Sequence, residues 1–185
     1  NKKKIFRYLE KKNIFPSRIL KEQFLFIPVI ISEKGNDISI FSNNPIYDDW
    51  NKINKRYQLI KYLLPSEDLE DLNLIKEKLD VIETYDFNEI TKKYFLKNSI
   101  ISLIFKGKNE VRILTKIYND KNEIIKNDTF KNINIDNETD LNFLIENLKN
   151  LFEDTWKKLN EINTSIKVPI TIKIKNDDLK KSNNF

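Results

Sequence analysis

The sequence predicts an α+β fold: a mainly antiparallel sheet with helices packed on one face. Three stretches rich in β-branched residues, 99–106, 110–118 and 122–131, follow one another with only short polar turns between them, which is typical of an antiparallel meander. Apolar residues at helical spacing precede and follow this meander. Because no repeat or linker interrupts the chain, we expect one domain over residues 1–176, and a polar, frayed end of a longer chain over 177–185.

The first quarter of the chain is predicted to hold a helix, a buried strand and a short returning strand. Residues 2–13 place apolar side chains at helical spacing. Residues 24–31 form an unbroken apolar run, which indicates a strand buried on both faces. Pro28 lacks an amide donor, so we expect a bulge or an unpaired side there. A returning strand follows over residues 37–41.

A helix start and a further strand are predicted next. Asn44 is a favourable cap and Pro45 is favourable at the first helical position. Apolar residues then recur at i, i+4, i+7 and i+11, and they are Ile46, Trp50, Ile53 and Tyr57. The pattern therefore predicts a helix through Tyr57. A strand over residues 59–64 ends at Pro65.

Two further helices are predicted before the meander. Ser66 is expected to cap the first, which begins with several acidic residues and packs through Leu69, Leu72, Ile75 and Leu79. Asp86 and Glu89 form a variant of the capping box for the second, whose inward residues are Phe87, Ile90 and Tyr94.

After the meander we expect the longest helix and a last strand. The helix is capped near Asn137, and its apolar face comprises Leu141, Leu144, Ile145, Leu148, Leu151, Phe152, Leu159 and Ile162. Residues 166–175 alternate aliphatic with mostly lysine side chains, which predicts a half-exposed strand.

The composition excludes several classes of enzyme and cofactor site. The chain has no His and no Cys, which excludes His-dependent nucleophilic catalysis, CxxC redox pairs, and imidazole or thiolate metal sites. With two Gly in total, neither a P-loop nor a dinucleotide-binding loop can be built. We therefore expect no cofactor and no catalytic residue. The absence of Met indicates a processed product or a piece of a longer chain, and no apolar run is long enough to span a membrane.

The net charge of +5 is weak support for a polyanionic partner. Of the 33 cations 29 are lysines, and the excess of Lys, Asn and Ile is consistent with an AT-rich bacterial genome. The presence of only four arginines argues against nucleic acid as the partner. The residues that would serve a nucleic-acid-binding alternative are those of a lysine-rich sheet face: Lys167, Lys173 and Lys175, with Arg112, Lys116 and Tyr118 of the meander.

Two groups of residues are weak candidates for sites. Asp68 and Asp71 share a helix face and would be the ligands of a carboxylate-metal-dependent hydrolase, although acids in a first helical turn also stabilise the helix without a metal. The second group comprises Asn44, Pro45 and Trp50, whose first interpretation is structural, as a turn and a core anchor. In the alternative interpretation these three residues face a partner, as do the lysines of the last strand, Lys167, Lys173 and Lys175.

Two apolar segments carry a family resemblance. Leu25-Phe-Ile-Pro-Val29 is similar to an "LxxPV" strand, and residues 40–50 are similar to an "LWxxxNPWxxxW" element with Asn44, Pro45 and Trp50 at matching positions. Both elements are found in a family of exported proteobacterial proteins catalogued as domain of unknown function 2066. The resemblance runs from about residue 24 to about residue 120.

A third segment, 64–72, resembles the "PxGDxxDL" stretch of the same family, with Asp68 and Asp71 in register. Phe41 stands where the family has Trp, and residues 66–67 replace its usual glycine, which weakens any site at that turn. The resemblance implies an αβ fold, a signal-bearing precursor and a periplasmic location, and it implies no activity. From the sequence we therefore expect a monomeric, non-enzymatic binding or scaffold domain of the cell envelope, with an envelope protein as its partner.

Overall fold

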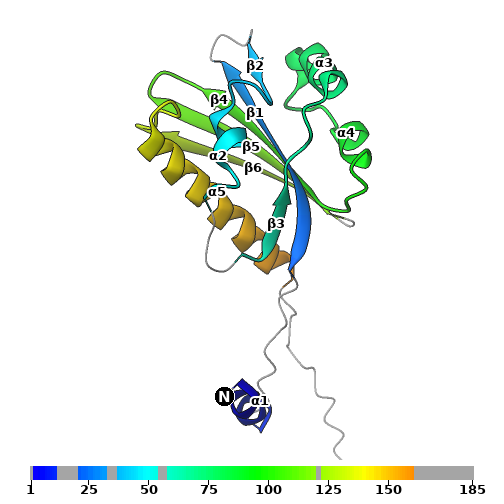
Figure 1. The fold of residues 1–185 in the computed structure, drawn as a ribbon, viewed down its shortest axis with the longest axis vertical. Helices are drawn as coiled ribbons and strands as arrows, with labels where there is room; N and C mark the ends of the chain where they lie inside the picture. The colour runs from blue at the N-terminus through cyan, green and yellow to red at the C-terminus, as the bar shows by residue number, and fades with distance from the viewer. Residues whose placement is uncertain (1, 12–20, 33–36, 54–57, 120–121, 161–185) are drawn as a thin grey trace, which may run out of the picture.

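A six-stranded mixed sheet with helices on both faces forms the body of the protein (Figure 1). The computed structural model describes residues 2–11, 21–32, 37–53, 58–119 and 122–160. The strands are β1 (Glu22–Ser32), β2 (Ile38–Ser39), β3 (Ile60–Leu63), β4 (Ser99–Lys106), β5 (Glu110–Tyr118) and β6 (Glu123–Lys131). The helices are α1 (Lys2–Lys11), α2 (Pro45–Asp49), α3 (Leu69–Glu77), the 3-10 turn η1 (Leu79–Val81), α4 (Asn88–Lys92) and α5 (Glu138–Leu159).

The meander lies beside a strand from the first part of the chain. Strands β4, β5 and β6 pair antiparallel in sequence order, at the positions that the sequence predicts. Strand β1 pairs with β4 in parallel, with Leu25 opposite Ser99. On its other edge β1 pairs in parallel with β3 and antiparallel with β2. The predicted α+β class with a mainly antiparallel sheet is confirmed, and β1 supplies its parallel pairings.

Pro28 occupies a gap in the pairing of β1. Leu25 donates its amide toward the β4 side, to Asn98 O, whereas Glu22 donates on the other side, to Leu59 O. Because successive residues of a strand point their amides to opposite edges, the nitrogen of Pro28 lies on the second edge. Strand β3 pairs there with residues 22–25 and β2 with residues 30–31, so Pro28 falls between the two. The predicted unpaired side at Pro28 is therefore confirmed.

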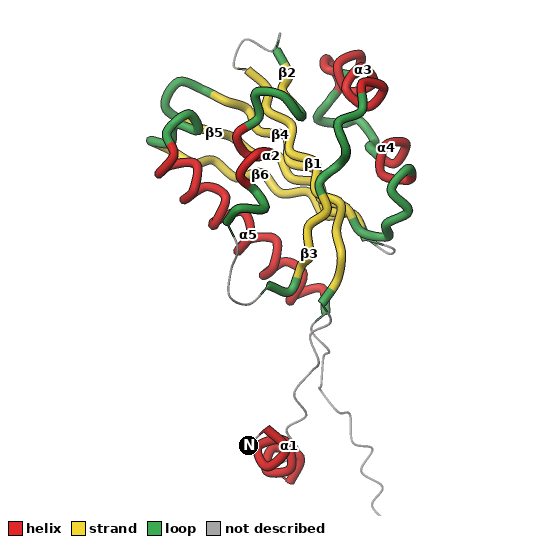
Figure 2. Tube along the Cα trace, viewed as in Figure 1, coloured by secondary structure: helices red, strands yellow, loops and turns green. Residues whose placement is uncertain are grey.

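The two faces of the sheet bury two separate hydrophobic cores, one under α5 and α2 and the other under α3, η1 and α4 (Figure 2). Alternate residues of β1 divide between them: Phe24, Phe26 and Ile30 face the first core, and Leu25, Ile27, Val29 and Ile31 the second. The expectation that helices cover only one face is thus corrected. A strand that is apolar at every position requires cover on both sides.

Some predicted elements differ in length or lie outside the described residues. Helix α2 ends at Asp49, earlier than predicted, and the carbonyl groups of Trp50 and Ile53 beyond its end accept hydrogen bonds from Lys149 of α5. Helix α3 is capped by Asp68 and not by Ser66, which leaves the predicted core residue Leu69 76% exposed. The predicted strand 166–175 lies outside the described residues.

Candidate functional site

Asn44 connects three parts of the fold through one buried side chain. Its Oδ1 accepts from the amide of Tyr47 and so caps α2. Its Nδ2 lies 3.0 Å from Pro28 O, 2.9 Å from Ile40 O and 3.2 Å from Ser39 O. The side-chain amide thus donates to backbone oxygens at the gap where no strand pairs with β1. This is a structural role.

Trp50 is a core residue as well. Its ring stacks on that of Phe26, with centroids 3.9 Å apart, and it meets Tyr62 edge-on at 5.2 Å. Asn44 and Trp50 are both 0% exposed. The predicted partner-facing role is therefore wrong for these two residues, because their neighbours cover them completely. Pro45 is half-buried, and the other partner-facing candidates, Lys167, Lys173 and Lys175, lie outside the described residues.

The two candidate metal ligands have other partners. Asp68 Oδ1 accepts from the amide of Glu70 at the start of α3. Asp71 is 2% exposed, and its carboxylate receives hydrogen bonds from Lys93 Nζ at 2.8 Å and from the Tyr94 hydroxyl at 3.4 Å. Hydrogen bonds to Asp71, and then to Glu70, raise the pKa of Lys93. In the described part of the chain no three acidic side chains gather into a cation site. The geometry favours a structural role for both aspartates.

The meander residues of the nucleic-acid-binding alternative do not form an open basic stripe. Arg112 forms an ion pair with Glu83, and its guanidinium lies 3.9 Å from the centroid of the Phe105 ring. Lys116 is 2% exposed. Burial, followed by the charge of Glu123, raises the pKa of Tyr118. These side chains are therefore held against protein groups rather than presented to a phosphate backbone.

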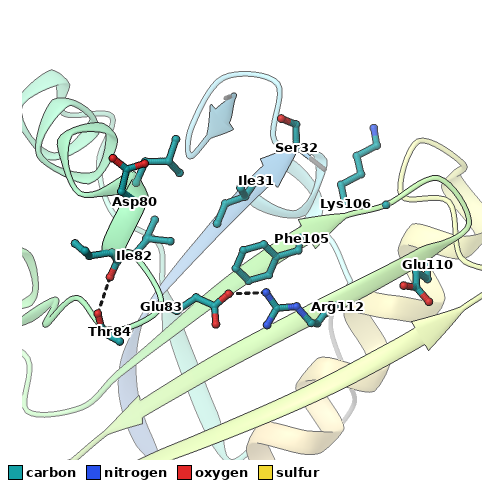
Figure 3. A pocket seen from close by; sticks show the side chains of 13 residues that line it. Ile31, Ser32, Asp80, Ile82, Glu83, Thr84, Phe105, Lys106, Glu110 and Arg112 are labelled. Atoms are coloured by element: carbon teal, nitrogen blue, oxygen red, sulfur yellow. Dashed lines mark hydrogen bonds and ion pairs between the residues drawn. The ribbon is translucent and has the colours of Figure 1, made fainter. Parts of the chain in front are cut away.

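One cleft, of about 570 Å³, opens between η1 and the ends of β1, β4 and β5. We call it the Phe105 cleft. Its apolar side chains include Ile31, Ile82 and Phe105, and Figure 3 shows the Phe105 ring between Ile31 and Arg112. Cross-strand pairing places Phe105 directly opposite Arg112.

The charged rim of the Phe105 cleft has a negative excess. Both of its cations are already paired, Arg112 with Glu83 and Lys106 with Asp136. Asp80 and Glu110 also line the cleft, and neither forms an ion pair within the described residues. The cleft therefore combines an apolar surface with two available carboxylates.

A second hollow, of about 540 Å³, lies between α4 and the opposite ends of β5 and β6. We call it the Lys116 pocket. Its lining is more polar than that of the Phe105 cleft and includes Tyr85, Lys116 and Tyr118. Lys116 Nζ donates to the backbone oxygen of Tyr85 at 2.8 Å, and burial lowers the pKa of this ammonium group.

No protein-family model matches the chain, and neither the curated proteins nor the solved structures include a significant match. The family resemblance therefore stays a prediction. Of the helices that the structure describes, none has the length and apolar character needed to cross a membrane.

The sequence does not reveal either hollow directly. The cleft depends on the position of η1, and the sequence predicts only a helix that continues to Leu79, the first residue of η1. One feature of the cleft can be inferred from the sequence: the short turn at 107–109 fixes the register of the β4–β5 hairpin, which places Phe105 opposite Arg112. In the nucleic-acid-binding alternative, the sequence analysis groups Lys116 with Arg112 and Tyr118 on one exposed sheet face. That face is covered by the segment around Phe87, which the strand pattern does not show.

Proposed function

We propose that the chain is a non-enzymatic binding domain that holds a basic segment of a partner protein, with an apolar side chain of that segment inserted in the Phe105 cleft. One observation carries the proposal: the cleft has an apolar base, its cations are already paired, and Asp80 and Glu110 at its rim have no ion pair among the described residues. Lysine or arginine side chains of a partner would complete those pairs. Location at the cell envelope is part of the proposal and rests on the family resemblance alone.

The carboxylate-metal hydrolase remains an alternative with less support. It requires Asp71 to give up its hydrogen bonds with Lys93 and Tyr94. The nucleic-acid-binding alternative requires Arg112 to leave Glu83 and Lys116 to emerge from burial. Neither rearrangement is favoured by the contacts described above.

Fluorescence anisotropy with short labelled peptides tests the proposal. The probes place one leucine or phenylalanine among lysines, and a control set places the same residue among glutamates. We expect saturable binding of the basic set, which weakens roughly three- to tenfold in the double variant Asp80→Asn, Glu110→Gln. Glu146→Gln, an exposed acid on α5 outside the cleft, is the matched control and should leave affinity unchanged. Equal binding of both peptide sets, or no loss in the double variant, would refute the assignment.

A further inference from the structure

Lys116 is a buried cation that lies near the carboxylates of Glu123, Asp86 and Glu83 but forms no ion pair with any of them. Its side chain is 2% exposed, and its ammonium group donates one hydrogen bond, to the neutral carbonyl of Tyr85, and lies 5.6 Å from the centroid of the Phe87 ring. None of the ion pairs among the described residues includes it. A buried ammonium without a carboxylate partner is costly, because the lost hydration is not replaced.

Lys149, also buried, has more hydrogen-bond acceptors than Lys116. Lys149, on the opposite face of the sheet, donates to two backbone oxygens, those of Trp50 and Ile53, and lies 5.0 Å from the centroid of the Trp50 ring. Its burial joins α5 to the end of α2, which accounts for it within the fold. Lys116 has one such bond and lines an open hollow instead.

A second unsatisfied donor lines the same pocket. The hydroxyl of Tyr85 is buried, lies near the carboxylate of Glu89, and has no hydrogen bond of ordinary geometry among the described residues. Burial, with the nearby acids Glu89 and Asp86, raises the pKa of Tyr85, so the hydroxyl keeps its proton at neutral pH. Tyr85 and Lys116 both lie against the ring of Phe87, at centroid distances of 4.9 Å and 5.6 Å respectively. Two hydrogen-bond donors, the Lys116 ammonium and the Tyr85 hydroxyl, thus belong to residues that line one hollow.

The remaining lining suits a small polar ligand. The pocket holds about 540 Å³, within the range of small-molecule sites. The described residues that line it include the cations Lys92, Lys97 and Lys116 and the carboxylates Asp86 and Glu123. Asn122 also lines the pocket and carries a side-chain amide that can donate, whereas the amide of Asn88 already donates to Asp86 Oδ2.

We propose that the Lys116 pocket binds a small ligand through an oxyanion, a carboxylate or a phosphate group, which accepts hydrogen bonds from the Lys116 ammonium and the Tyr85 hydroxyl. The oxyanion supplies a hydrogen-bonded counter-charge, which no carboxylate among the described residues gives Lys116, and charge-assisted hydrogen bonds of this kind are the strong ones. This site is separate from the Phe105 cleft, and its occupation does not depend on the partner proposed above.

Isothermal titration calorimetry on the whole chain, with inorganic phosphate and with succinate at matched ionic strength, tests the site. We expect one saturable site for at least one probe. Lys116→Met should weaken it about tenfold or more, since a charge-assisted hydrogen bond is lost, and Tyr85→Phe should weaken it about threefold. Lys131→Met, at the exposed end of β6 outside the pocket, is the control and should bind as the parent does. The far-ultraviolet circular dichroism of each variant shows whether it is folded.

The outcomes separate the ligand classes. Phosphate binding without succinate binding assigns the site to phosphate-bearing ligands, and the reverse assigns it to carboxylates. A second readout is independent of the variants: a bound anion should raise the pKa of the Lys116 ammonium, followed by nitrogen-detected lysine NMR. If neither probe binds the parent chain, or if Lys116→Met binds as tightly as the parent, the proposal is overturned.

Discussion

The role of Asn44 leads to a quantitative prediction for Asn44→Ala. The substitution removes the cap of α2, worth about 1 kcal/mol. It also leaves the buried carbonyl oxygens of Pro28 and Ile40 without their donor, at about 1 kcal/mol each. We therefore expect the free energy of unfolding to fall by roughly 3 kcal/mol. Urea denaturation followed by tryptophan fluorescence measures the change.

A matched control separates the cap from the carbonyl contacts. Asn137 caps α5 through the same type of bond, accepting from the amides of Thr139 and Asp140, but these bonds are exposed. Asn137→Ala should therefore cost only about 1 kcal/mol. In Asn44→Asp the acceptor is kept, but an oxygen replaces the donor, so we expect a loss at least as large as in Asn44→Ala. Equal losses in Asn44→Ala and Asn137→Ala would show that the contacts with β1 contribute nothing.

Three further predictions concern titration and backbone conformation. Burial lowers the pKa of Lys116 below its ordinary 10.5, so between the lowered pKa and 10.5 the folded chain binds fewer protons than the unfolded chain. The free energy of unfolding should therefore rise with pH over this interval. Urea denaturation of the parent chain at pH 7 and pH 10 should show the rise, and Lys116→Met should lack it. Burial raises the pKa of Tyr62, so in alkaline titration by tyrosinate absorbance the step that coincides with unfolding should shrink in Tyr62→Phe. Phe95 has φ of 52° and is 94% exposed, so Phe95→Gly should raise the free energy of unfolding by up to about 1 kcal/mol, measured as a higher melting temperature. Asn132→Gly, at φ of 57°, should change the melting temperature little, because Asn tolerates this conformation.

The local elements of the fold were predictable because their signals lie within short stretches. The meander is marked by its turns, and the cap of α5 by Asn137. The parallel pairing of β1 with β4 joins residues 74 positions apart, 25 and 99, and no periodicity reports it. The hydrogen bonds from Lys149 to the carbonyl groups of Trp50 and Ile53 likewise join residues 99 and 96 positions apart, and no local pattern predicts them.

The candidate sites were less predictable than the fold. The sequence marks Asn44 as a helix cap and Trp50 as a large apolar residue at helical spacing. Both features reflect structural roles, and both residues are buried, so neither can face a partner. Lys116 stands out less, because lysine is the expected residue on an exposed strand face. Only the segment that covers the strand, with Tyr85 and Phe87, turns this lysine into a buried group. Such cover comes from tertiary structure and leaves no local pattern.

The place of β1 in the sheet has a consequence for how the chain folds. The β4–β5–β6 meander closes through two short hairpins, whereas β1 must pair with β4 across a separation of 74 positions, from Leu25 to Ser99. Loop-closure entropy therefore favours early formation of the meander and late docking of β1. During synthesis from the N-terminus, β1 emerges before its partner exists. Its apolar run, residues 24–31, is then an exposed strand prone to aggregation until the meander has been made, which is the state that holdase chaperones protect.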